Sequence, residues 1–172
     1  MVSNPRALER SLAHNRIVHN TYLMQPDLRL DEQLCFALYS ASRATTAAYR
    51  DALVDAGLTY PQYLVMLALW EDDGLSVGAL GRRLHLDSGT LSPLLARLES
   101  AGFVSRSRPD RDGRRVVVHL TPAGAELRGE AERIQCALLD RLDMSLEDIV
   151  TLRDLANRLT ASVTTHSQPA AS

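Results

Sequence analysis

The chain has 172 residues, of which 45% are hydrophobic, and its formal net charge is −2. This length and composition suit one domain with a buried core, and no apolar run is long enough for a transmembrane helix. The first 25 residues carry Arg6, Glu9, Arg10 and Arg16 where a signal peptide needs an apolar stretch. We therefore expect a cytoplasmic protein without a membrane partner.

Positive charge is concentrated in one stretch of the chain. Residues 82–119 hold eight arginines and four acidic residues, although the chain as a whole is slightly acidic. A basic stripe on an acidic body is typical of a surface that binds phosphates. A solvated arginine-rich surface is the alternative explanation.

The chain begins with residues 1–28, which lack sustained periodicity and are treated as an N-terminal extension. Apolar residues then recur at helical spacing from Leu30 to Ala56, and Gly57 stands where a helix stop belongs. Pro61 suits the first turn of the next helix, which ends near residues 72–74. Two helices are therefore predicted before residue 75.

Two short helices and a hairpin are expected next. Ser76 can cap the first helix, and Asp87 or Ser88 can cap the second, which runs to Gly102. Pro93 lies inside the second helix and predicts a kink, because proline lacks a backbone donor. Alternating and apolar runs at residues 103–106 and 116–120, around a turn at 109–113, predict a β-hairpin.

Two further helices complete the predicted domain. Thr121 can cap one with Pro122 at its first position, and Ser145 with Asp148 forms a capping box for the other. Residues 167–172 read as a loose tail. The fold class is therefore α+β but mostly α, with a winged helix-turn-helix at about 58–121 between helices at about 30–56 and 122–165.

The order helix, short helix, turn, helix and hairpin suits DNA recognition. An α-helix fits the major groove, and a hairpin tip can place arginine in the minor groove. Ser88, Thr90 and Ser92 near the start of the second helix, and Arg97 further along, are the candidate contacts. The alternative is that Ser88 is only a cap and that Thr90 and Ser92 are ordinary polar surface.

Four segments resemble the MarR family of winged-helix repressors. They are Leu58–Tyr63 (LTYPQY), Leu86–Leu95 (LDSGTLSPLL), Asp112–Arg114 (DGR) and Leu120–Gly124 (LTPAG). The resemblance implies a domain at residues 29–166 that binds double-stranded operator DNA as a homodimer, with the flanking helices forming the dimerisation lobe. It implies that Arg114 enters the minor groove. Arg111 and Arg115 of the arginine-rich hairpin are further candidate DNA contacts.

A cysteine near the start of the first long helix is the candidate sensor. Cys35 lies about one turn into a helix that Asp31 could cap, and a helix N-terminus favours the nucleophilic thiolate, although Asp31 and Glu32 oppose it. Tyr39, at i+4, shares the helical face of Cys35 and could donate a hydrogen bond. A small buried hydrophobic cysteine is the alternative.

Tyr49 stands fourteen residues after Cys35, about 21 Å along a straight helix. It cannot contact Cys35 of its own chain, whereas antiparallel pairing with a second subunit would bring the two together. Tyrosines buried in the core with satisfied hydroxyls are the alternative.

The segment Leu30–Tyr39 (LDEQLCFALY) resembles the OhrR branch of the MarR family, the organic hydroperoxide resistance regulators. The resemblance implies a repressor that leaves DNA when an organic hydroperoxide oxidises Cys35. It also implies that Tyr49 and Tyr60 bond the partner's reactive cysteine, while Tyr39 acts within its own subunit. One subclass resolves the oxidised thiol with a second cysteine, for which Cys136 is the candidate, with a structural cysteine as the alternative.

Three other functions remain open from the sequence. A MarR repressor could be released by a phenolic or carboxylic ligand, the chain could be a thiol peroxidase, or it could be a dimeric scaffold that does not bind DNA. The five histidines form no ligand spacing, so we expect no metal and no cofactor. We expect a regulator and not an enzyme.

Overall fold

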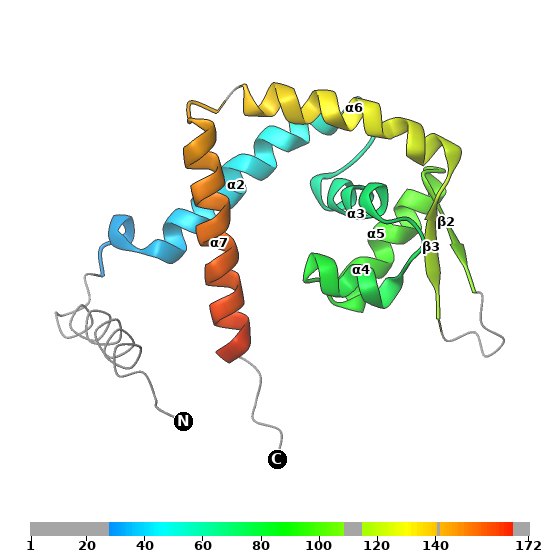
Figure 1. Cartoon of the computed structure of the whole chain (residues 1–172), viewed down its shortest axis with the longest axis horizontal. Helices are drawn as coiled ribbons and strands as arrows, with labels where there is room; N and C mark the ends of the chain where they lie inside the picture. The colour runs from blue at the N-terminus through cyan, green and yellow to red at the C-terminus, as the bar shows by residue number, and fades with distance from the viewer. Residues whose placement is uncertain (1–27, 109–114, 141, 167–172) are drawn as a thin grey trace, which may run out of the picture. The chain divides into compact units, whose positions relative to one another are not determined.

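A computed structural model describes residues 28–108, 115–140 and 142–166 (Figure 1). The N-terminal extension, the hairpin turn and the C-terminal tail that the sequence predicts lie outside these residues, apart from Leu28. The chain divides into two compact units, Met1–Ala47 and Ala48–Ser172. The described part is mostly helical with a small antiparallel sheet, which confirms the expected fold class.

The first long helix begins later than the sequence suggests. A short 3₁₀ helix, η1 (Leu30–Glu32), precedes α2 (Leu34–Leu53), and Gln33 between them has extended backbone angles. The C-terminal stop is confirmed, since Gly57 has a φ of +65° and its N–H donates to the Val54 carbonyl at 3.0 Å. The Leu58 N–H donates to the Leu53 carbonyl at 3.2 Å, which completes a Schellman motif.

The three central helices begin at the residues that can cap them. In α3 (Tyr60–Glu71), the Gln62 side chain accepts from the Thr59 N–H at 2.8 Å. In α4 (Val77–Leu84), Ser76 accepts from the Ala79 N–H at 3.2 Å. In α5 (Ser88–Ser100), Asp87 is the cap, which decides between the two candidates. These bonds satisfy N–H groups that a helix start leaves without intrahelical partners.

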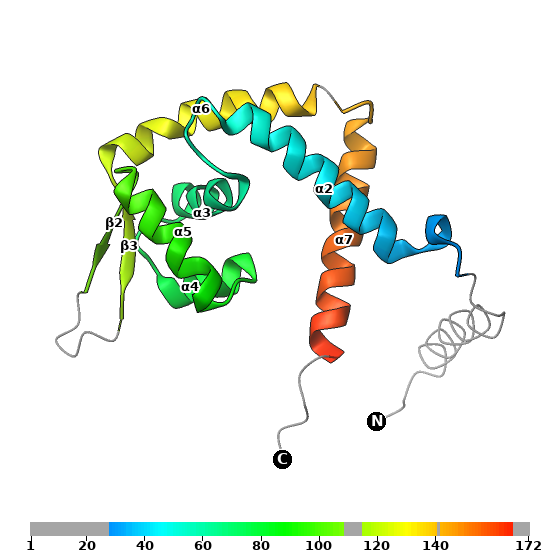
Figure 2. The same ribbon diagram turned by 180° about the vertical axis from the view of Figure 1, so that it is seen from behind.

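The sheet has three antiparallel strands in the order β1-β3-β2. The hairpin of β2 (Val104–Ser107) and β3 (Val117–Leu120) confirms the prediction, with Val104 opposite Leu120 and Ser107 opposite Val117. Strand β1 (Leu75–Ser76) pairs with the other edge of β3 and was missed, because two residues carry no periodicity. Figure 2 shows the hairpin beside α5, which β2 contacts.

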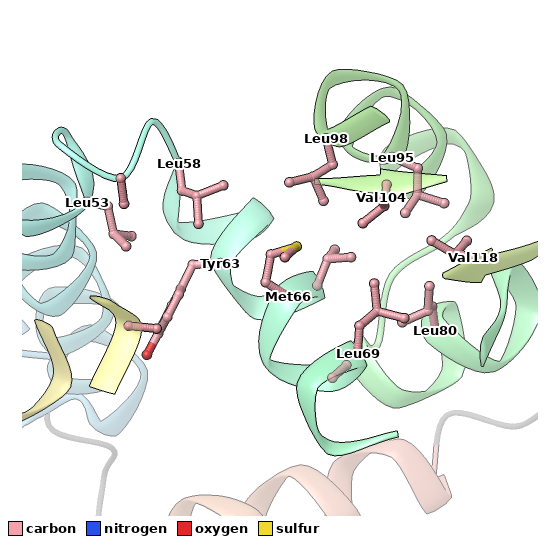
Figure 3. Packing of buried hydrophobic residues seen from close by; sticks show 14 of the residues in the cluster. Leu53, Leu58, Tyr63, Met66, Leu69, Leu80, Leu95, Leu98, Val104 and Val118 are labelled. Atoms are coloured by element: carbon pink, nitrogen blue, oxygen red, sulfur yellow. The ribbon is translucent and has the colours of Figure 1, made fainter. Parts of the chain in front are cut away.

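The core of the winged lobe lies between α3, α4, α5 and the sheet. Met66 and Leu69 project from α3 toward Leu80, Leu95 and Val118 (Figure 3). All five side chains are almost completely buried. Apolar burial at about 25 cal/mol per Å² makes this cluster the main stabilising contribution to the lobe.

A close contact fixes the start of α6 (Pro122–Leu139) against the lobe. Thr121 caps the helix by accepting from the Gly124 N–H at 3.1 Å, as predicted. A Cβ at Gly124 would overlap the carbonyl oxygen of Phe103, so only glycine fits there. The Trp70 Nε1–H donates to the Gly124 carbonyl at 2.8 Å, which ties α6 to α3.

The last helix, α7 (Leu146–His166), follows Ser145, whose hydroxyl accepts from the Asp148 N–H at 3.1 Å and donates to the Asp148 carboxylate at 2.6 Å. The predicted cap at Ser145 is therefore confirmed. Several apolar side chains of α7 are largely exposed, among them Leu152 and Leu155, at 51% and 53%.

Candidate DNA-binding surface and thiol site

Helix α5 buries one apolar side and exposes polar residues around the rest of its surface. Leu91, Leu95 and Leu98 are buried, while Ser88, Thr90, Ser92 and Arg97 are all exposed. The four predicted recognition residues therefore share one helix with its apolar side turned into the lobe. This is the arrangement that a helix in the major groove requires.

Local hydrogen bonds organise the first turn of α5. The Asp87 carboxylate accepts from the Thr90 N–H and from the Thr90 hydroxyl, both at 2.9 Å. These bonds lower the pKa of Asp87. The Ser92 hydroxyl donates to the Ser88 carbonyl at 2.7 Å. The hydroxyl protons of Thr90 and Ser92 are thus used within the helix, and their oxygen lone pairs remain for donors on a ligand.

Pro93 lies inside α5, which nevertheless runs without interruption from Ser88 to Ser100. Proline supplies no N–H to the carbonyl four residues earlier, at Gly89. Gly89 is exposed, so water can satisfy that carbonyl. The helix does not restart at Pro93, and the predicted kink stays a prediction.

The arginines around α5 differ in whether an acidic side chain neutralises their charge. The Arg106 Nε donates to Glu99 at 2.9 Å, and this ion pair lowers the pKa of Glu99 and raises that of Arg106. Arg97 and Arg115 are exposed, and neither forms an ion pair in the described part of the chain. Arg111 and Arg114 lie outside the described residues.

A hollow between α4, α5 and β2 adds residues that the sequence did not single out. Arg82 and Arg106 line it together with Ser88 and Ser92. Both arginines belong to the basic stretch 82–119, but that stretch alone does not show which of its arginines face the recognition helix. The fold brings two cations to the side of α5.

The candidate sensor thiol is exposed at the start of α2. Cys35 is the second residue of the helix, and its thiol is free. The expected cap at Asp31 is wrong, because Asp31 lies in η1 and α2 begins only at Leu34. Cys35 therefore lies closer to the start of its helix than the sequence predicted. Cys35 is thus exposed in the single chain, whereas the alternative from the sequence was a buried cysteine.

Tyr39 lies one turn after Cys35 and interacts with Arg43. The Arg43 Nη1 donates to the Tyr39 hydroxyl oxygen at 3.1 Å, and the guanidinium carbon lies 5.5 Å from the ring centroid. The Tyr39 side chain is 56% exposed. Tyr39 is therefore held by a cation at the end of its ring and does not lie in the core.

Tyr49 and Tyr60 form an aromatic cluster that also contains Tyr63. The ring centroids of Tyr49 and Tyr60 are 4.8 Å apart, and those of Tyr49 and Tyr63 are 5.5 Å apart. Burial raises the pKa of Tyr49 and of Tyr60, and with the two neighbouring hydroxyls it raises the pKa of Tyr63 to about 12. The cluster therefore offers protonated hydroxyls at neutral pH. The sequence analysis did not single out Tyr63, because its ring contacts with Tyr49 and Tyr60 arise only in the folded chain.

Cys136 lies near the end of α6 and is also an exposed free thiol. Exposure leaves its sulfur accessible to another thiol. In the described residues no group of histidine, cysteine and acidic side chains could hold a metal ion. No helix among the described residues is long and apolar enough to cross a membrane.

Together, the winged lobe, the polar face of α5 and the neighbouring arginines define a DNA-binding regulator. A sequence profile of the MarR family matches residues 58–116. The chain is 43% identical over 126 residues to the organic hydroperoxide resistance transcriptional regulator of Bacillus subtilis, covering 73% of this chain and 86% of that protein. The chain belongs to the MarR family.

Three further comparisons agree with this assignment. The chain is 49% identical over 125 residues to the HTH-type transcriptional regulator TtmR of Methylorubrum extorquens, covering 73% of this chain and 64% of that relative. Reduced AbfR bound to DNA, a protein of Staphylococcus epidermidis, superposes with a TM-score of 0.72 at 33% identity, covering 84% of this chain and 99% of that one. A structure of AbfR with a disulfide formed superposes with a TM-score of 0.58 at 35% identity. It covers 81% of this chain and 98% of that one.

Proposed function

We propose that this MarR-family regulator represses transcription as a homodimer and releases its operator when an organic hydroperoxide oxidises Cys35. The observation that carries the proposal is an exposed thiol in the first turn of α2, with the Tyr39 phenol one turn further on. The similarity to a hydroperoxide resistance regulator, and to a protein solved in reduced and disulfide forms, supports it.

DNA binding is assigned to the exposed face of α5 and to the wing. Ser88, Thr90, Ser92 and Arg97 face the major groove in this proposal, and Arg115 contacts the backbone near the wing. Arg111 and Arg114, whose surroundings are not described, complete the wing contact. A dimer places its two recognition helices in successive major grooves of a pseudo-palindromic operator.

The sensing reaction begins with the Cys35 thiolate. Its sulfur attacks one peroxide oxygen, the S–O bond forms as the O–O bond breaks, and the departing alkoxide takes a proton to become an alcohol. The cysteine is oxidised to a sulfenic acid while the hydroperoxide is reduced. Tyr39 of the same subunit, and Tyr49 and Tyr60 of the partner subunit, donate hydrogen bonds to the sulfur in this scheme.

Cys136 of the partner subunit is the proposed resolving thiol. Its sulfur attacks the sulfenic sulfur of Cys35, a disulfide forms, and the sulfenic oxygen leaves as water. Oxidation shifts the dimer toward a geometry in which the half-site spacing no longer fits, so the operator is released.

The test uses the full chain and DNA selected by the protein itself. Duplexes of about 30 base pairs, long enough for two half-sites one helical turn apart, are selected for binding to the reduced protein. Gel shifts are then run before and after cumene hydroperoxide. Cys35→Ser should bind DNA and stay bound after oxidant, whereas the unmodified chain should dissociate. A Cys35→Ser protein that still dissociates would overturn the proposal.

Cys136→Ser is the matched control. Intact mass spectrometry of the oxidised wild type should show a dimer linked through Cys35 and Cys136, and Cys136→Ser should not link. Oxidant consumption should stop at about one hydroperoxide per sensor thiol when no reductant is present. Sustained turnover with a dithiol reductant would instead identify a thiol peroxidase.

A further inference from the structure

We infer that Arg43 is a positioning residue of the hydroperoxide sensor, which holds the Tyr39 hydroxyl so that its proton is free to point toward Cys35. The inference deepens the proposed function and rests on Cys35 being the reacting thiol. It assigns a role to a residue that the motifs of the sequence did not single out.

Two separate contacts place Arg43 on Tyr39. The Arg43 Nη1 donates to the Tyr39 hydroxyl oxygen at 3.1 Å, and its guanidinium carbon lies 5.5 Å from the centroid of the same ring. The hydrogen bond holds the oxygen, and the cation–π contact holds the ring plane. In the described part of the chain no carboxylate pairs with Arg43, so its charge is directed at Tyr39.

The three residues follow one another along a single face of α2. Cys35, Tyr39 and Arg43 are spaced i, i+4 and i+8, so each is the nearest same-face neighbour of the next. Long side chains of an α-helix lean toward its N-terminus. This tendency favours a Tyr39 ring that points toward the turn that carries Cys35. Arg43 contacts Tyr39 from the C-terminal side of the helix.

The Tyr39 hydroxyl can accept a hydrogen bond from Arg43 and donate one toward Cys35 at the same time. A tyrosine hydroxyl has one proton to donate and two lone pairs, whereas arginine only donates. The Arg43 bond thus occupies a lone pair of Tyr39 and leaves its proton available for an acceptor on the Cys35 side. A donor that is already polarised by a cation forms a stronger hydrogen bond. Tyr39 would therefore stabilise the thiolate sulfur of Cys35 before it attacks the peroxide.

A purely structural role for Arg43 makes a different prediction. An exposed pair of side chains on one helix contributes little to stability. Removing Arg43 should thus leave folding and reduced-state DNA binding almost unchanged. An effect on the rate of Cys35 oxidation would then report positioning.

The experiment is a double-mutant cycle on the oxidation rate of Cys35, measured in the full chain with Cys136→Ser in every variant. Cumene hydroperoxide is the oxidant, and loss of free thiol is followed with time. Arg43→Met should slow the reaction about fivefold, the effect of roughly one hydrogen bond. Tyr39→Phe should slow it by a similar factor. Arg43→Lys, which keeps a charge and a donor, should recover most of the rate.

The double variant shows whether Arg43 affects the oxidation rate through Tyr39. If Arg43 acts through Tyr39, Arg43→Met should add no further slowing in the Tyr39→Phe background. Arg50→Met, an exposed arginine on the same helix, is the matched control and should leave the rate unchanged. An additive Arg43→Met effect, or none, would overturn the inference. A wild-type Cys35 that does not react at all would instead refute the proposed function.

Discussion

The winged lobe and helix α7 bury their apolar side chains to very different degrees. In the lobe, Leu80, Leu98 and Val118 have no exposed surface, whereas Leu152 and Leu155 of α7 are more than half exposed. The lobe buries these apolar side chains within one chain. Helix α7 keeps a set of apolar residues that the described part of the chain leaves largely exposed.

This difference separates the two tasks of the proposed regulator. A rigid lobe holds the recognition helix in a fixed shape, because its core is filled by one chain. A helix with exposed apolar residues suits the contact between subunits, whose geometry changes in the proposed release of the operator. The two regions should therefore respond differently to substitution.

The largest expected effect tests the rigidity of the lobe at Gly124. Gly124→Ala would push a methyl group into the Phe103 carbonyl oxygen and break the contact at the start of α6. We expect urea unfolding to show a loss of about 3 kcal/mol or more. Gly129→Ala on the same helix has open space around its Cβ and should instead stabilise the chain, by about 1 kcal/mol or less. Equal effects at the two glycines would contradict the close packing of Gly124 against the Phe103 carbonyl.

The next effect concerns the tyrosine cluster at high pH. The pKa of Tyr63 is raised to about 12, so the folded state favours the neutral phenol more than the unfolded state does. The raised pKa therefore contributes to the free energy of unfolding. This contribution is fully present below pH 10 and is lost as the pH rises through about 12. Its upper bound is about 3 kcal/mol. Tyr63→Phe should flatten the dependence of urea stability on pH between 10 and 12, and an unchanged slope would show that Tyr63 is not the cause.

The elements of the lobe could be predicted from the sequence because their signals are local. Ser76, Asp87 and Thr121 each mark a helix start through a bond to a backbone N–H three residues later. Strand β1 could not be predicted, because its two residues are ordered only by pairing with β3. The start of α2 was predicted too early, since the apolar period continues through η1.

The candidate site could be predicted only in part, for a related reason. Motifs identify Cys35 and Tyr39, but the ring contact between Tyr49 and Tyr63 depends on how α2 and α3 pack. The bond from Arg43 to Tyr39 has helical spacing and could have been noticed, yet many i, i+4 pairs never meet. Side-chain contacts between elements are properties of the folded chain.

A smaller effect tests the exposed face of α7. Leu155→Asp places a charge on a side chain that is 53% exposed, so the fold of the single chain should be little affected. If this residue lies between subunits, losing its burial should weaken the dimer at least tenfold. Sedimentation velocity over a concentration series measures this. Asn157→Asp, an exposed polar position on the same helix, is the control, and equal dissociation constants would place Leu155 outside the dimer contact.

The smallest expected effect compares two arginines of the lobe in their salt dependence. Arg97 is exposed and forms no ion pair in the described part of the chain, whereas Arg106 is already neutralised by Glu99. Each phosphate contact adds about 0.9 to the slope of log affinity against log salt. In anisotropy titrations with a selected duplex, Arg97→Ala should therefore reduce the steepness of that slope by about 0.9, the value of one phosphate contact. Arg106→Ala should reduce it by less. A larger loss at Arg106 would mean that DNA displaces Glu99 from Arg106, so that the ion pair belongs to the unbound lobe alone.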